Sequence, residues 1–216
     1  MEASFDFRAG RKLEPKCYNK LMKRNETVLR LPFSGEWFVL WGGDNKDNNE
    51  YHHEVSNQRY AFDFVVLDEN DASHKEDGNQ NDDYYAFGKE ILAPADGIVV
   101  KVVDDIEDNI PGQTNEKDIA GNAVLIKHKE DEISVLAHLK KGSIKVKIGD
   151  SVKTGQVIGL CGNSGNSTEP HLHYHLQDSE DIYSGEGIKC FFQNVYVKNT
   201  NKQENEYSPV MDDIIS

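Results

Sequence analysis

From His171 to Leu176 the chain alternates histidine with an apolar residue at every position. In a β-strand, successive side chains point to opposite faces, so this pattern predicts three imidazoles on one face and three apolar side chains against a core. Imidazole is both the commonest transition-metal ligand and the usual general base near neutral pH. The segment therefore indicates a metal site with acid/base help, or else a half-buried strand whose histidines bond to their neighbours.

The rest of the chain is dominated by short runs of aromatic and β-branched residues, and these runs are separated by Gly, Pro, Asn and Asp. This pattern is typical of strands and turns, and no long segment has a helical period. We expect an all-β domain of antiparallel sheets with little helix and a core from about Leu29 to Val197. The expected strands cover residues 28–33, 36–41, 60–67, 97–104, 123–128, 133–138, 151–152, 157–161 and 171–177, and a short helix is expected at residues 17–23.

At 216 residues the chain is long enough for one substantial domain. We expect an N-terminal extension at residues 1–49 whose strands pack on the core, a main domain at 50–197 and a polar C-terminal tail at 198–216. Two long polar stretches, 68–88 and 104–120, interrupt the strands of the main domain. Loops of this length are usually functional or disordered, and both stretches could border a cleft.

The net charge of −14 argues against a nucleic-acid-binding surface, because such surfaces carry a basic stripe. Cys17, Cys161 and Cys190 are widely spaced and odd in number, which indicates neither a disulfide framework nor a thiolate zinc site. No run approaches the roughly 20 apolar residues of a membrane span. The sequence as written lacks a secretory signal and predicts a cytoplasmic protein, although a secreted chain trimmed of its signal would look the same.

Two further residues have the chemistry of a metal or catalytic site. A catalytic zinc usually has three protein ligands from His, Asp and Glu, so the histidine strand needs partners from elsewhere. Asp63 lies in a strongly apolar run, where an unpaired carboxylate would be costly to bury. A metal ion would offset that cost, and so would an ion pair with Arg59. His138 ends another apolar run and could orient water or stabilise developing charge.

Taken in order along residues 50–177, these segments resemble the lysostaphin/LytM-type zinc metallopeptidases, which are peptidoglycan (cell-wall) endopeptidases with a duplicated-hybrid-motif fold. The resemblance is strongest in the stretch Gly162–His173, which ends in a His-Leu-His motif. The other matching segments are Tyr60–Phe64, Ile91–Val100, Gly121–His128, Leu136–Leu139 and Val146–Gly159.

The resemblance implies that His173 and Asp63 bind zinc, while His171 and His138 assist catalysis. It also implies the reaction, in which zinc activates a water molecule to attack a peptide carbonyl. One position departs from the family pattern: the first zinc histidine normally lies four residues before the aspartate, where this chain has Arg59. Arginine stays protonated and is not a ligand.

Three histidines could replace the missing ligand. His52 and His53 lie upstream in a loop that could fold back to the metal, and His175 lies on the same strand face as His173. His52 is the preferred replacement, although an exposed loop without any ligand is about equally compatible with this stretch.

The sequence therefore favours a zinc metalloendopeptidase (a hydrolase) whose substrate is peptidoglycan or another short peptide. The main alternative is a degenerate, non-catalytic member of the same family that serves as a binding or regulatory module, and Arg59 motivates it. A carrier domain is the least favoured, because Gly149–Gln156 resembles a turn of biotinyl and lipoyl domains but no modifiable lysine signature follows. The sequence does not predict an oligomeric state.

Overall fold

Antiparallel strands make up nearly all the regular structure of residues 23–216, the part of the chain that the computed structural model describes. Two three-residue 3-10 helices are the only helical elements in that part, η1 (Ser56–Gln58) and η2 (Asn81–Asp83). None of its helices could cross a membrane. The strands are β1 (Trp37–Trp41), β2 (Phe62–Val65), β3 (Glu90–Leu92), β4 (Gly97–Val103), β5 (Asn122–Lys129), β6 (Glu132–Leu139), β7 (Ser151–Val152), β8 (Val157–Leu160), β9 (Leu172–Gln177), β10 (Gly187–Ile188), β11 (Phe192–Val197), β12 (Lys202–Tyr207) and β13 (Ile214–Ile215).

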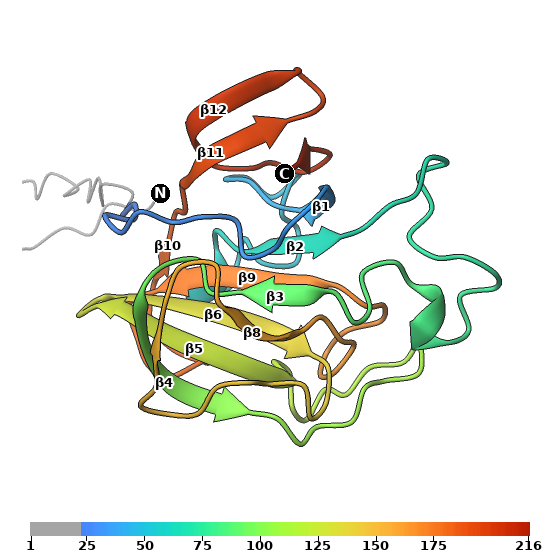
Figure 1. Cartoon of the computed structure of the whole chain (residues 1–216), viewed down its shortest axis with the longest axis horizontal. Coiled ribbons are helices and arrows are strands. Elements are labelled where there is room, and N and C mark those ends of the chain that lie inside the picture. Colours follow the sequence, from blue (N-terminus) through green and yellow to red (C-terminus); the bar gives the residue numbers. More distant parts are fainter. Residues whose placement is uncertain (1–22) are drawn as a thin grey trace, which may run out of the picture.

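The all-β prediction is confirmed, whereas the helix expected at residues 17–23 lies outside the described residues except for its last position. Eleven strands form one sheet whose main path runs β12-β11-β13-β1-β2-β9-β6-β5-β4-β7, and β3 pairs with β8 in a separate ribbon. The histidine strand β9 lies between β2 and β6, as Figure 1 shows. Three segments far apart in the sequence therefore meet side by side at the middle of the sheet.

The predicted alternation along β9 is confirmed. Leu172, Tyr174 and Leu176 are fully buried in the main core, while the three histidines line a cleft on the opposite face. The Tyr174 hydroxyl lies 3.0 Å from Ser134 Oγ, so the one polar atom on the core face is satisfied. The sheet thus has a core face that anchors β9 and a second face that carries chemistry.

Strand β6 contains an extra residue just before it ends. Asn122 pairs with Leu139 but Val124 pairs with Leu136, so three steps along β6 oppose two steps along β5. His138, within this bulge, adopts a left-handed backbone with φ of 59°. A bulge breaks the two-residue alternation, and His138 consequently lines the same cleft as Ala137, its neighbour in sequence.

Residues 28–33, predicted as a strand, form no strand, and this prediction was wrong. Within them Leu29 makes a single parallel bridge to Phe192, and the chain bends at Pro32, which has no N–H to donate to a ladder. Leu29 and Phe33 are nevertheless buried in the main core. The apolar pattern therefore predicted correctly that these residues are buried, but it predicted incorrectly that they pair as a strand.

The C-terminal residues include strands that the sequence did not predict. β11 and β12 form a hairpin, drawn in red in Figure 1, and β13 inserts between β11 and β1. Ile215 pairs with both Trp37 and Val197 and is fully buried. The exposed side chains of β12 are mostly charged or polar, which hid this strand from an analysis based on apolar pattern. The division at 49 and 197 remains a prediction.

Replacing Ile215 by alanine tests whether the C-terminal strand stabilises the fold. We expect Ile215→Ala to lower the free energy of unfolding by about 2–4 kcal/mol, because the substitution leaves a cavity between β1 and β11. Val210→Ala is the matched control, since Val210 is 38% exposed, and it should cost under about 1 kcal/mol. Urea unfolding measures both; equal small losses would mean that the C-terminal strand is not docked.

Candidate metal centre

A buried carboxylate and two imidazoles meet on the cleft side of the sheet. Asp63 on β2 is directly opposite His173 on β9, and His173 Nδ1 lies 2.9 Å from Asp63 Oδ1. His52, from the turn that precedes η1, approaches the other carboxylate oxygen, with Nε2 at 3.5 Å from Oδ2. One ligand atom from each of the three residues lies within 4.8 Å of the others, and all three residues are buried.

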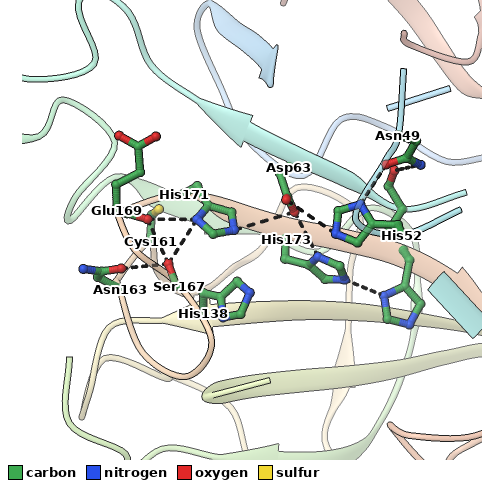
Figure 2. A network of polar contacts seen from close by, with 12 residues as sticks. Asn49, His52, Asp63, His138, Cys161, Asn163, Ser167, Glu169, His171 and His173 are labelled. Atoms are coloured by element: carbon green, nitrogen blue, oxygen red, sulfur yellow. Dashed lines mark hydrogen bonds and ion pairs between the residues drawn. The ribbon is translucent and has the colours of Figure 1, made fainter. Parts of the chain in front are cut away.

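The ring of His52 is fixed by a neighbour that the sequence analysis did not select. His52 Nδ1 lies 2.8 Å from Asn49 Oδ1 (Figure 2). The amide nitrogen of Asn49 donates to the carbonyls of Gly43, Arg59 and Ala61, so its oxygen must face His52 as an acceptor. His52 therefore donates from Nδ1 and turns an unprotonated Nε2 toward Asp63.

These donors fit a metal ion. Ligand atoms about 2.0–2.2 Å from one ion at tetrahedral angles are separated by roughly 3.2–3.6 Å, which is close to the separations around Asp63. Two nitrogens and one carboxylate suit a divalent transition metal, and three protein ligands leave a fourth position open. A cation there would also balance the negative charge of Asp63, which is 8% exposed.

The alternatives for the missing ligand are separated by the structure. His52, the preferred replacement, lies in the three-residue group, whereas His53 does not. Arg59 is exposed, and no ion pair between it and Asp63 occurs in the described chain. His175 faces the cleft but lies behind His173, with its Nδ1 at 2.9 Å from His173 Nε2. His175 is thus placed to contact a ligand rather than to be one.

His138 and His171 lie beside the triad. The ring centroid of His138 is 4.7 Å from that of His171 and 5.6 Å from that of His173. His138 Nδ1 donates to the Ser164 carbonyl at 2.8 Å, and His171 Nδ1 donates to the Glu169 carbonyl at 2.8 Å. In the neutral form of either ring, Nε2 is therefore the nitrogen without a hydrogen. His171 Nε2 lies 3.6 Å from Asp63 Oδ1, and Figure 2 draws this contact.

Burial sets the charge state of the site. It lowers the pKa of His52 to about 4, although Asp63 opposes the shift, and it lowers the pKa of His138 well below the ordinary value, with His171 and His173 adding to the effect. Burial raises the pKa of Asp63, but the surrounding histidines, His52 first, lower it by more. At neutral pH Asp63 is therefore ionised and His52 is neutral, which is the protonation state that metal binding requires of these two residues.

The five residues open into a cleft of about 520 Å³. Thr114, Ile119 and Ala120 from the second polar stretch line it, while the first stretch, 68–88, contributes none of the described lining residues. Trp41, Tyr51 and Tyr183 supply aromatic walls, and Tyr51 and Tyr183 are 69% and 59% exposed. The described lining contains no lysine or arginine. Tyr51 directly precedes His52 in the sequence, and this aromatic–histidine pair was a usable signal that the sequence prediction did not include.

Comparison with known proteins finds similarity to metallopeptidases. Residues 82–184 match the family model described as Peptidase family M23. An uncharacterized metalloprotease of Buchnera aphidicola is 33% identical over 125 residues, which are 58% of this chain and 29% of that protein. The peptidoglycan DD-endopeptidase ShyA of Vibrio cholerae is 38% identical over 98 residues, 45% of this chain and 20% of that protein. The chain thus matches less than a third of the length of either relative.

Solved structures with a similar fold include two catalytic domains. That of lysostaphin from Staphylococcus simulans is 22% identical with a TM-score of 0.41, over 69% of this chain and 85% of that chain. That of the prophage-encoded M23 protein EnpA from Enterococcus faecalis is 20% identical with a TM-score of 0.46, over 74% and 93% of the two chains.

The antiparallel fold and the buried His–Asp–His group that lines the cleft are the features expected of a metallopeptidase domain. Within that class the chain belongs to peptidase family M23, the lysostaphin/LytM-type peptidases, as the resemblance of its motifs predicted. The matched stretch contains His138, His171 and His173, whereas Asp63 and His52 lie before it. The most unusual ligand position therefore falls in the part of the chain that the family model does not cover.

Neighbouring histidines allow a matched test of the triad. We expect His52→Ala to lose the bound metal, because two remaining ligands hold an ion weakly, and His53→Ala to keep about one ion per chain. Elemental analysis after reconstitution and gel filtration measures both. If only the His53 variant lost its metal, the ligand would be His53 and our assignment to His52 would be wrong.

Proposed function

We propose that the chain is a zinc-dependent metalloendopeptidase that cleaves a peptide bond in peptidoglycan cross-bridges or in a similar short peptide. One observation carries this proposal: His52 reaches Asp63 from an upstream turn and completes a His–Asp–His donor set, although Arg59 has replaced the usual histidine. A chain that had lost its metal would have no reason to keep an imidazole there, held by a dedicated asparagine.

In this proposal His52, Asp63 and His173 hold the ion through Nε2, a carboxylate oxygen and Nδ1. When bound, zinc supplies a Lewis acid that polarises a carbonyl and acidifies water. The ring of the ligand His52 is held by a second contact, from its Nδ1 to Asn49 Oδ1. Such contacts fix the orientation of the rings before the metal arrives.

The roles of His171 and His138 follow from their free nitrogens. His171 Nε2 lies beside Asp63 at the cleft surface, where it can accept a proton from an attacking water molecule and return it to the leaving amine. The ring of His138 lies next to that of His171, with the two ring centroids 4.7 Å apart. Because its Nδ1 donates to a fixed backbone carbonyl, its Nε2 faces the cleft, where it can orient water or, once protonated, stabilise a developing oxyanion.

The substrate assignment is supported by the cleft and by the relatives. The cleft has a volume of about 520 Å³, and its described lining contains no lysine or arginine and no acidic residue other than Asp63. ShyA is named as a peptidoglycan DD-endopeptidase. Purified cell-wall sacculi and soluble peptides should be compared as substrates, with released fragments identified by mass spectrometry and a chelator as control. Turnover of neither substrate by zinc-loaded protein would contradict the proposal.

Arg59 favours a second candidate, a non-catalytic binding or regulatory module of the same family. This reading predicts that the reconstituted wild-type chain retains no zinc and hydrolyses nothing. The two candidates thus differ at the first measurement, the metal content of the wild-type protein.

Alanine at the two remaining histidines separates catalysis from metal binding. We expect His138→Ala and His171→Ala to keep zinc but to lose about 10²–10⁴-fold in kcat, because each removes a proton-transferring or charge-stabilising group. His74→Ala, which changes a histidine outside the cleft, should leave both properties unchanged. Loss of zinc from either cleft variant would show that its histidine is a ligand.

A further inference from the structure

Three buried polar residues behind His173 have no part in the roles assigned so far. His175 Nδ1 lies 2.9 Å from His173 Nε2, and His175 Nε2 lies 2.9 Å from Gln177 Oε1. Asn57, from η1, donates to the same Gln177 oxygen at 2.9 Å. His175, Gln177 and Asn57 are all buried, so each of these polar atoms needs its partner.

The backbone fixes the direction of this hydrogen-bond chain. The amide nitrogen of Gln177 donates to the carbonyls of Ser179 at 2.6 Å and Asp181 at 2.8 Å. Backbone carbonyls can only accept, so Gln177 cannot turn its amide over, and its oxygen must face His175. Asn57 is held in the same sense, because its amide nitrogen also donates to the Ile182 carbonyl at 3.1 Å.

The orientation of Gln177 in turn fixes which ring nitrogens of His175 and His173 donate. Facing the Gln177 oxygen, His175 must carry its hydrogen on Nε2. A neutral imidazole has one such hydrogen, so Nδ1 of His175 is an acceptor, and His173 must donate from Nε2. A neutral His173 that donates from Nε2 has the lone pair of its Nδ1 directed at Asp63 Oδ1, 2.9 Å away. Two acceptors at this distance repel unless a cation lies between them.

We propose that His175, held by Gln177 and Asn57, is the positioning residue of the metal centre. It selects the tautomer and ring orientation of His173 that present Nδ1, and not Nε2, to the ion. The proposal rests on the function proposed above for the same site. It also explains why a third histidine follows the His-Leu-His motif at the same strand face while contributing no ligand atom.

The first test needs no metal and reads the hydrogen-bond direction itself. Long-range ¹H–¹⁵N spectra of metal-free protein labelled at histidine nitrogens report which ring nitrogen carries the hydrogen. We expect His175 to be protonated at Nε2 and bare at Nδ1. The opposite tautomer would overturn the proposal whether or not the protein is a peptidase.

The second test measures zinc affinity by competition with a chelator. His175→Phe keeps a ring of similar size but removes the acceptor, and we expect a loss of about 10–100-fold in zinc affinity, as for other contacts to metal-bound histidines. His175→Asn is the matched variant, because its Oδ1 can replace the lost Nδ1 acceptor, and it should retain most of the affinity. Equal affinities for all three proteins, or equal losses in both variants, would contradict the positioning role.

The outcomes distinguish this proposal from the proposed function. Wild-type protein that binds no zinc contradicts the peptidase, whereas the histidine tautomers of that same protein still decide the hydrogen-bond direction. Wild-type protein that binds zinc and cleaves peptide, but is indifferent to His175→Phe, leaves the peptidase intact and removes only the positioning role. Should the Phe variant fail to fold, the tautomer measurement on wild-type protein decides alone.

Discussion

The cross-strand contact between Asp63 and His173 is the constraint on which the site depends. It places a carboxylate beside imidazoles at the middle of an antiparallel sheet, where burial of an unbalanced charge is costly. Several neighbouring residues offset the cost of burying this charge. His52 and His171 lie beside the carboxylate, and Asn49 and His175 contact the rings of His52 and His173. In the proposed metal centre a divalent cation would complete the balance of charge.

One face of β9 packs in the core and stabilises the fold, and the other face carries the histidines of the cleft. Tyr174 and its apolar neighbours are buried in the main core and fix the strand, so His171 and His173 need not contribute to packing. The bulge at the end of β6 then adds His138 to the same cleft. Left-handed backbone at a non-glycine residue costs of order 1–3 kcal/mol. A strained backbone at a residue that faces a metal centre is consistent with selection for function rather than for stability.

Much of this arrangement could be predicted from sequence, because it depends on local pattern. The two-residue period of the histidine strand predicted which side chains lie on each face. The apolar residues around Asp63 indicated that a metal ion or an ion pair offsets the burial of its carboxylate. The remainder depends on long-range geometry. No local signal reports that the turn holding His52 folds back onto β2, that Asn49 can orient it, or that β6 contains a bulge. The strand β12 was missed for the opposite reason, since its polar side chains conceal the pairing that its backbone makes with β11.

The central claim is that His52 takes the place that Arg59 cannot fill, and direct location of the ion tests it. Anomalous diffraction at the zinc edge from crystals of the zinc-loaded chain would place the metal without reference to activity. We expect one ion about 2.0–2.2 Å from His52 Nε2, a carboxylate oxygen of Asp63 and His173 Nδ1. An ion bound by His53 or His175 in place of His52, or by Nε2 of His173, would contradict this account of the site.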